Sequence, residues 1–359
     1  MSNGLTRPTH RRQRFGAALT MLLAAFALQA ADTAHAQPDP VAEFYKGKTV
    51  TILVGYEGGG GYDLYARIIA QFLGKHIPGN PAVIVQNMPG AGGLRAARNL
   101  MTVSAKDGTA LGMLAQTLPF DTLLGYTPDV DAARFIWIGR AAMNVEVGVA
   151  IAKTGVTSIE DARKREVPTA GTGGTASSTV VPFLLNQLAG TRFKLIAGYK
   201  SANEALVTME RGEVDVVGAI GLATVQARHA ANLKDGTFRL IYQSALTRHR
   251  DIPNVPTIGE LGAGKDQRVI LDLFASGADI GRALIAPPEV PPARVAALRR
   301  ALAATLADPE LIAFAKKGNL PIEPGTGEEL ETVVRQVLAT PKPIADKAKE
   351  VMESLKTQR

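Results

Sequence analysis

Cysteine is absent from this sequence and aromatic residues are scarce, since Phe, Trp and Tyr together make up 5 % of the 359 residues. Without cysteine the chain has no disulfide, no thiol nucleophile and no Cys-ligated metal. Its five histidines are scattered along the chain without the spacing of a metal site. The G-x-S-x-G elbow of many hydrolases is missing as well. These absences point away from an enzyme, and we expect no catalytic residues, no metal and no cofactor.

A strong charge of one sign is also lacking. The 40 basic and 33 acidic residues leave a net charge of +7, and no cluster of Lys and Arg with interleaved aromatics suggests nucleic acid as a partner. Apolar residues are abundant at 46 %, and there are 36 glycines. The length and apolar content predict two compact domains, and the glycines predict many tight turns.

The N-terminal segment has the pattern of an export signal. Arg11, Arg12 and Arg14 precede a short apolar stretch at 15–30, and an Ala-x-Ala sequence then ends at Ala36. A membrane anchor is the alternative, but a spanning helix needs about 20 apolar residues. We therefore expect residues 1–36 to be a signal peptide that is cleaved after Ala36, and the mature protein to be periplasmic.

Short apolar runs alternate with helical patterns, which predicts an α/β fold with largely parallel sheets. The expected strands are 50–56, 82–87, 110–115, 134–139, 145–152, 167–171, 194–199, 214–219 and 238–243. Segment 145–152 alternates in polarity, which suggests a half-exposed or edge strand. The expected C-terminal helices are 292–307, 309–317, 326–339 and 343–356, and segments 139–145 and 243–285 are candidate crossings between lobes.

Four consecutive glycines follow the first predicted strand, and a helix begins directly after them. Glycine can turn successive backbone N–H groups toward one point, and a helix start adds unpaired N–H groups and a partial positive charge. A ligand carboxylate would fit there without any arginine. The candidate ligand-binding residues of this turn are Gly58, Gly59, Gly60, Gly61, Tyr62 and Asp63. Asp63 has two possible roles, as a helix cap and as an acceptor for a ligand amine or hydroxyl.

Two further glycine turns also lie between a predicted strand and a predicted helix. The second provides Gly90, Ala91 and Gly92 as candidates. The third offers hydroxyl groups beside a helix start, and its candidates are Thr172, Gly174, Thr175, Ser177 and Ser178. Three such turns in one chain predict a cleft that is built largely from backbone donors.

The order of these motifs resembles the receptor family of tripartite tricarboxylate transporters, often called Bug or TctC proteins. Segment 87–93 (NMPGAGG) is similar to the family's Asn-Arg-Pro-Gly-Ala-Gly-Gly, and 58–63 stands where the family has Gly-Gly-x-x-Asp. Segments 253–257 and 285–291 match further family motifs in the expected order. Each motif alone is weak, and their order makes the resemblance specific.

The resemblance implies a type II periplasmic binding-protein fold, an α/β fold of two lobes joined by a hinge with two crossing segments. We expect lobe 1 to begin in 37–141, lobe 2 to occupy 142–245, and 246–359 to hold the hinge return, the rest of lobe 1 and the C-terminal helices. The implied function is an extracytoplasmic receptor, a monomer, that captures a small carboxylate ligand and delivers it to the membrane subunits of a tripartite tricarboxylate-type transporter.

Two alternatives remain open at this point. The chain could be a ligand-sensing subunit for a membrane sensor kinase. It could also be an exported hydrolase, if a histidine and an acid converged on Ser177 or Ser178.

The sequence departs from the family pattern near the first turn. Glu57 stands where the family has proline, Tyr62 where it has threonine or serine, and Met88 where it has arginine or lysine. A Glu57 carboxylate that pointed into the cleft would oppose a second carboxylate on the ligand, whereas one that faced solvent would not. Glu57 and Tyr62 therefore favour an aromatic, monocarboxylate or amino-bearing ligand over a citrate-like one.

Overall fold

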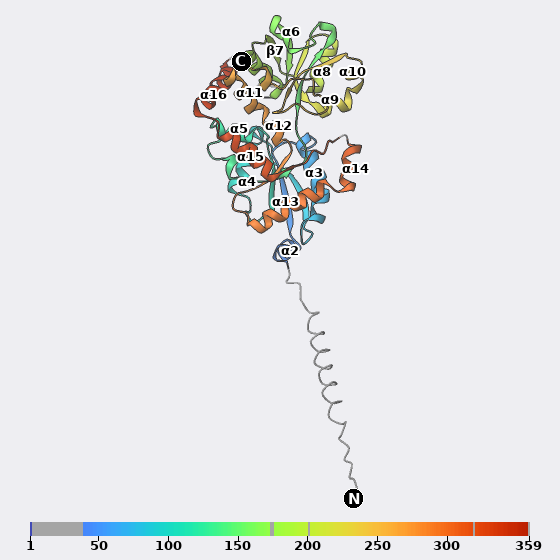
Figure 1. Cartoon of the computed structure of the whole chain (residues 1–359), viewed down its shortest axis with the longest axis vertical. Helices are drawn as coiled ribbons and strands as arrows, with labels where there is room; N and C mark the ends of the chain where they lie inside the picture. Colours follow the sequence, from blue (N-terminus) through green and yellow to red (C-terminus); the bar gives the residue numbers. More distant parts are fainter. Residues whose placement is uncertain (2–38, 173–175, 200–201, 319, 358–359) are drawn as a thin grey trace.

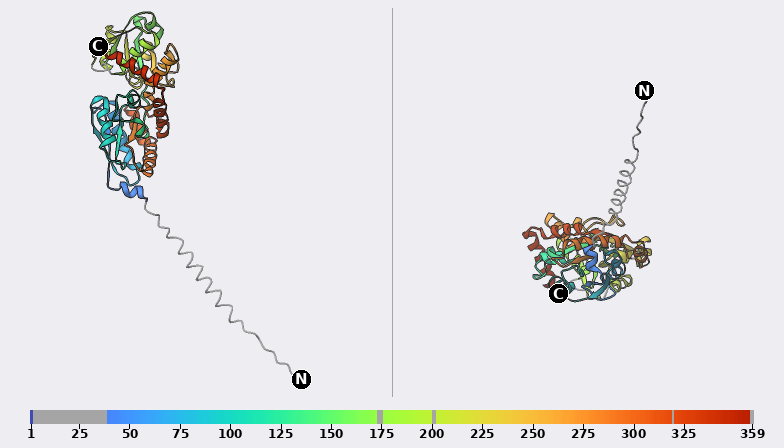
Figure 2. Two further views of the ribbon diagram at one scale, coloured as in Figure 1. Left: turned by 90° about the vertical axis from the view of Figure 1, so that its left-hand side faces the viewer. Right: turned by 90° about the horizontal axis from the view of Figure 1, so that it is seen from below.

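The computed structural model has two α/β lobes joined end to end, with a narrow junction between them (Figures 1 and 2). It describes residue 1 and residues 39–172, 176–199, 202–318 and 320–357. The predicted signal peptide, apart from Met1, and the candidates Gly174 and Thr175 lie outside the described residues. Within the described part, none of the helices has the length and apolarity that crossing a bilayer would need.

Lobe 1 is built on a six-stranded sheet in the order β11-β4-β10-β3-β1-β2. Its strands are β1 (Thr49–Val54), β2 (Ala82–Asn87), β3 (Ala110–Met113), β4 (Ile136–Arg140), β10 (Ala283–Ala286) and β11 (Gly325–Thr326). Strands β1, β2 and β3 are parallel, while β10 runs antiparallel to both of its neighbours. One face carries α3 (Gly61–Leu73), α13 (Pro292–Leu306) and α14 (Pro309–Lys317), and the other carries α4 (Leu94–Thr102), α5 (Leu118–Leu123) and α15 (Gly327–Leu338). The short α2 (Pro40–Tyr45) packs with the first group.

Lobe 2 is built on a five-stranded sheet in the order β7-β6-β8-β5-β9. Its strands are β5 (Glu146–Ile151), β6 (Val167–Gly171), β7 (Phe193–Ala197), β8 (Val216–Gly221) and β9 (Phe238–Ser244). The helices on one face are α6 (Ile159–Lys164), α7 (Ser177–Ala189), α11 (Lys265–Ala275) and α16 (Lys342–Thr357). Those on the other are α8 (Ala202–Arg211), α9 (Leu222–Arg228) and α10 (Ala230–Lys234).

All nine predicted strands are present with small shifts in their ends, but β10 and β11 were not predicted. The expectation for 145–152 was wrong, because β5 pairs on both sides, antiparallel to β8 and β9. Its apparent alternation includes Gly148, where an added Cβ would meet the Tyr242 ring at 2.4 Å. The glycine makes room for a buried tyrosine and does not mark a solvent face. The two sheets are therefore mixed, and the expectation of largely parallel sheets holds for only part of each.

The chain crosses between the lobes from β4 to β5 and again between β9 and β10, through α11 and the short α12 (Gly277–Ile280). These two crossings are hydrogen-bonded to each other. The backbone N–H of Arg282 donates to Ala142 O at 2.9 Å, and that of Asn144 donates to Ala278 O at 3.1 Å. Gly281 has φ 52°, and an added Cβ would lie 2.2 Å from Ala142 O. Only glycine fits this contact, so the two crossings form one joint.

A third passage, which was not predicted, carries the chain back to lobe 2. Helix α15 packs on lobe 1, and α16 then packs against α7 and α11 of lobe 2. On the same side of the junction, the rings of Phe120 in α5 and Phe274 in α11 lie 4.2 Å apart. The lobes are thus in apolar contact at this pair of rings, and Figure 1 shows α5, α11 and α16 on the same side of the junction.

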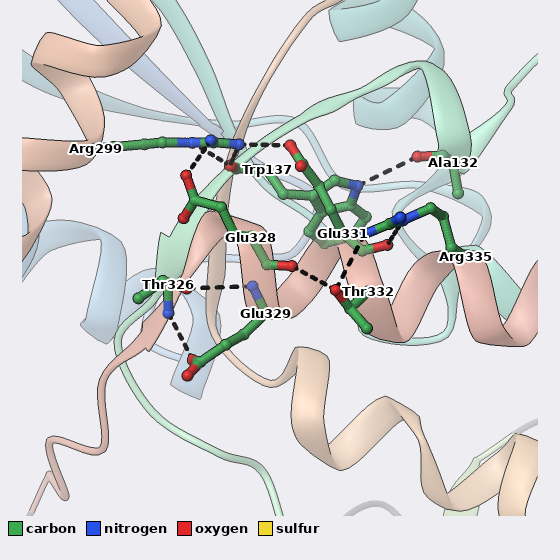
Figure 3. A network of polar contacts seen from close by, with 9 residues as sticks. All are labelled: Ala132, Trp137, Arg299, Thr326, Glu328, Glu329, Glu331, Thr332 and Arg335. Carbon is green, nitrogen blue, oxygen red and sulfur yellow. Dashed lines mark hydrogen bonds and ion pairs between the residues drawn. The ribbon is translucent and has the colours of Figure 1, made fainter.

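Arg299 joins three elements of lobe 1, as Figure 3 shows. Its guanidinium donates to the backbone oxygen of Trp137 in β4 at 2.9 Å and to the carboxylates of Glu328 and Glu331 in α15, each at 2.5 Å. Thr326 caps the start of α15 with Glu329 in a reciprocal capping box. Because the Arg299 side chain is only 22 % exposed, these bonds fix α15 against the sheet on which the cleft is built.

We expect Arg299→Ala to lower the free energy of unfolding by about 1.5–3 kcal/mol, because it removes hydrogen bonds to charged partners at a partly buried site. The matched control is Arg300→Ala, which changes the neighbouring exposed arginine and should alter stability by less than about 0.5 kcal/mol. Urea unfolding of both variants measures the difference. Equal effects would contradict the role assigned to Arg299.

Candidate functional site

A cavity of about 490 Å³ lies between the lobes and is lined by residues from both. Lobe 1 contributes the start of α3 and the segment 318–323, and lobe 2 contributes the end of β8, α9 and the segment 249–251. The crossing residues Asn144 and Arg282 also line it. We call this space the interlobe cavity.

A second cavity of about 340 Å³ lies on the lobe 2 side and is lined by Glu146, Thr172, Ser177 and Ser178 among others. It shares Gly221, Thr224 and Arg228 with the interlobe cavity. The two spaces therefore border the same wall of lobe 2, and we call the second one the lobe 2 cavity.

The first glycine turn reaches the interlobe cavity with two of its four glycines. Gly59 and Gly61 line the cavity, and all four glycines of the turn are exposed. Gly59 has φ 85°, which disfavours any other residue there. The N-cap of α3 is Gly60, which offers no side-chain oxygen to the first N–H groups of the helix. These donors and the partial positive charge of a 13-residue helix therefore remain available to an anion.

Asp63 holds this turn together from within. It is 2 % exposed. One carboxylate oxygen accepts from the backbone N–H of Gly59 at 2.8 Å and from Arg67 at 2.9 Å, and the other accepts from Asn87 at 2.9 Å. The hydrogen bond from Arg67 is the main reason why the pKa of Asp63 falls to about 2. Both oxygens are thus occupied, which favours the capping role over contact with a ligand.

Tyr62 lies behind the turn and supports an arginine. Its ring stacks on the ring of Tyr56, with centroids 4.4 Å apart. The Arg282 guanidinium lies over the Tyr62 ring, 3.9 Å from its centroid. The Tyr62 hydroxyl accepts from the backbone N–H of Gln116 at 3.0 Å. Burial raises the pKa of Tyr62, and the positive charge of Arg282 opposes the shift. Tyr62 therefore supports Arg282 by a cation–π contact. It is not among the residues that line the interlobe cavity.

Arg282 is held by neutral partners. Its Nη2 donates to the side-chain oxygen of Asn144 at 3.0 Å, and the Asn144 amide donates to Gln116 at 2.7 Å. Its Nη1 is buried and has no hydrogen-bond partner among the described residues. A charged donor left unpaired in this way costs about 1–3 kcal/mol or more. The site thus presents an uncompensated positive charge at the joint between the lobes.

The second glycine turn has a supporting position. None of Gly90, Ala91 and Gly92 lines either cavity. Instead, the turn packs behind the first one, and a Cβ added to Gly55 would lie 2.9 Å from the Cα of Gly93. The close approach of two backbones explains the glycines here.

The third turn lines the lobe 2 cavity with its hydroxyl groups. The backbone N–H of Thr172 donates to Ser178 Oγ at 2.9 Å, and Ser177 Oγ donates to Glu146 at 2.8 Å. An added Cβ at Gly218 would lie 2.0 Å from Ser178 O, so this glycine lets the start of α7 approach the sheet. The structure therefore brings Thr172, Ser177 and Ser178 together with an acid that the sequence analysis had not selected.

Arg282 and Glu146 are the two residues that sequence reasoning missed. Each is a charged residue that directly precedes an apolar run. The run is 283–286 after Arg282 and 147–151 after Glu146. A charge at the start of a buried strand was the only local sign of these two residues in the sequence. Glu57, by contrast, is exposed and lines neither cavity.

Each histidine in the described part has a partner away from Ser177 and Ser178. His76 contacts Asp308, His229 packs on Phe238, and His249 contacts Glu323 across the interlobe cavity at 3.2 Å. No histidine therefore completes a triad with either serine among the described residues. Those residues also contain no cluster of acidic and histidine side chains that could hold a metal ion.

Comparisons with known proteins agree with this architecture. The model of the tripartite tricarboxylate transporter family receptor, TctC, matches residues 65–349. A UPF0065 protein of Cupriavidus necator is 30 % identical over 244 residues, which are 66 % of this chain and 69 % of that protein. A TctC solute-binding protein from Polaromonas has a similar structure, with a TM-score of 0.64 and 19 % identity over 86 % of this chain and 99 % of its own. MatC from Rhodopseudomonas palustris with bound malate has a TM-score of 0.57 and 19 % identity over 85 % and 99 % of the two chains.

We expect Asp63→Asn to lower the free energy of unfolding at pH 7 by about 1–2 kcal/mol, because the carboxylate is stabilised in the folded state. The folded pKa of about 2 lies below the unfolded value of about 3.9. The contribution is therefore complete above about pH 4 and is lost as the pH falls toward 2. Urea unfolding of wild type and variant between pH 2 and pH 7 measures it. Asp266→Asn, in the first turn of α11, is the exposed control, and a difference from wild type that did not shrink at low pH would contradict the assignment.

Proposed function

This chain belongs to the TctC family of tripartite tricarboxylate transporter receptors, and on that premise we propose that it captures a small carboxylate in the interlobe cavity. We propose further that it acts as a monomer and delivers the ligand to the membrane subunits of a tripartite tricarboxylate-type transporter. The family consists of receptors, which are binding proteins and not enzymes.

The observation that carries the carboxylate proposal is the positive end of the interlobe cavity. The open start of α3 at Gly61 and the guanidinium of Arg282 are neighbours, since a Cβ added to Gly61 would lie 3.1 Å from Arg282 Nη2. Backbone N–H groups and an arginine fork are both suited to carboxylate oxygens. Three or four charge-assisted hydrogen bonds of about 1.5–3 kcal/mol each would supply much of the roughly 8 kcal/mol that micromolar binding needs.

Both lobes must contribute for the ligand to be enclosed. The cavity has walls from α3 in lobe 1 and α9 in lobe 2, so a ligand makes its full set of contacts only when the lobes are close together. A ligand of this kind shifts the population toward the closed arrangement by its differential affinity. Malate bound to the structural neighbour MatC supports a small ligand that carries a carboxylate.

We expect Arg282→Met to weaken carboxylate binding by at least about tenfold, because it removes a charged donor from the cavity. The mature chain is first screened by thermal shift with butyrate, malate, adipate, L-glutamate and 4-aminobutyrate. A ligand at 100 times its Kd adds about 2.7 kcal/mol of stability. Titration calorimetry with the tightest binder then compares Arg282→Met with wild type.

Arg250→Met is the matched control, because Arg250 also lines the interlobe cavity but its side chain is 79 % exposed. Its effect should stay within about threefold, as expected for an exposed charge. Far-UV circular dichroism and the Tm without ligand check that both variants fold. Equal affinities for wild type and Arg282→Met, or no stabilisation by any carboxylate, would overturn the proposed function.

We also propose that the signal peptide is removed after Ala36 during export to the periplasm. The intact mass of protein recovered from the periplasm should then correspond to a chain that begins at Gln37. A mature protein that retained the apolar stretch 15–30 would contradict this cleavage.

A further inference from the structure

Arg282 lines the interlobe cavity and Glu146 lines the lobe 2 cavity, and neither forms an ion pair with the other or with any other described residue. Arg282 bonds to the neutral Asn144 and stacks on Tyr62. Glu146 accepts one hydrogen bond, from Ser177 Oγ. Recessed charges in proteins are normally compensated by a partner of opposite sign. Here the side chains that hydrogen-bond to the two groups are neutral, and the exposed Arg228 is the other charged residue that lines the lobe 2 cavity.

The crossing segment places both charges in the same region. Asn144, which holds Arg282, lies two residues before Glu146, the first residue of β5. Glu146 pairs in register with Gly221 of β8, and Gly221 lines both cavities. The charge of Arg282 also acts on Glu146, because it opposes the rise in the Glu146 pKa that burial causes. The two groups are thus electrostatic neighbours, and the cavities that they line share a wall at Gly221 and Thr224.

A ligand that extends along this wall would meet a positive charge at one end and a negative charge at the other. A dicarboxylate would place its second carboxylate against Glu146, where like charges repel in a poorly solvated space. An ammonium group at that end would instead pair with Glu146 and would satisfy the oxygen that Ser177 leaves open. The two recessed charges are then compensated together by a single molecule.

We propose that Glu146 is a specificity-determining residue and that the ligand is zwitterionic, an amino acid whose carboxylate binds beside Arg282 and whose ammonium binds Glu146. This inference rests on the proposed carboxylate-binding function, and it adds the second charge of the ligand. It also explains why an acid begins a strand whose other residues are buried.

The test uses the mature chain and matched probes that differ in one group. The panel contains the twenty amino acids and 4-aminobutyrate, each with its analogue that lacks the ammonium (butyrate for 4-aminobutyrate). It also contains 4-hydroxybutyrate and succinate, in which another polar group replaces the ammonium. Affinities are measured by titration calorimetry for wild type, Glu146→Gln and Glu213→Gln. The last variant is the control, because Glu213 is an exposed glutamate of lobe 2. Glu146→Met serves as a second variant if the glutamine variant has a lowered Tm without ligand.

We expect at least one amino acid to bind wild type at least about tenfold more tightly than its analogue without the ammonium, as a charge-assisted bond implies. Glu146→Gln should lose that preference while its affinity for the analogue stays within about threefold. Glu213→Gln should match wild type.

Two outcomes overturn the inference while leaving the proposed function intact. In the first, succinate or butyrate binds in an Arg282-dependent way at least as tightly as any amino acid. In the second, 4-hydroxybutyrate binds most tightly and Glu146→Gln weakens it, which would assign a hydroxyl donor in place of the ammonium. If no carboxylate of any kind binds, the proposed function and this inference are overturned together.

Discussion

The structure of the cleft depends on a guanidinium that has to be held at the joint between two lobes without a carboxylate to pair with. Arg282 is fixed by the ring of Tyr62 and by the amide of Asn144, and its own backbone N–H ties the second crossing to the first. A charge compensated only by neutral groups keeps most of its attraction for an incoming anion. The same residue therefore connects the two crossings through its backbone and brings a positive charge to the cavity between the lobes.

The three glycine turns divide their roles in a way that follows from this constraint. The first lines the cleft, and Asp63 holds it in shape from inside the lobe. The second supports the first by a close backbone contact at Gly93. The third supplies hydroxyl groups to lobe 2, where Ser177 orients Glu146. Glycine thus leaves the backbone of one turn exposed to the cavity and allows close backbone packing in another. The sequence pattern is the same in both turns, and only the structure distinguishes them.

Much of the fold could be predicted from the sequence, because the apolar runs of the nine predicted strands and the helical periodicity between them are local signals. The helix predicted at 292–307 is present as α13, and its Leu298 and Leu302 lie in the core of lobe 1. Strand β10 was missed because three of its four residues lie within a segment interpreted as a crossing. The charged residues of the cleft could not be found in the same way. Asn144 and Arg282 are 138 residues apart, and a contact at that distance leaves no local pattern.

The third passage between the lobes has a consequence for how the chain acquires its structure. Lobe 1 combines β1 to β4 with β10, β11 and α15, and lobe 2 receives α16 after all of these. The Tyr65 hydroxyl donates to Pro321 O across 256 positions of sequence. Neither lobe is encoded by a continuous stretch, and lobe 2 cannot complete its core while the last helix is still missing. Long-range closure of this kind makes folding slow compared with chains of local contacts. A chain that ended before α16 would therefore contain every strand of both sheets and still leave one helical face of lobe 2 uncovered.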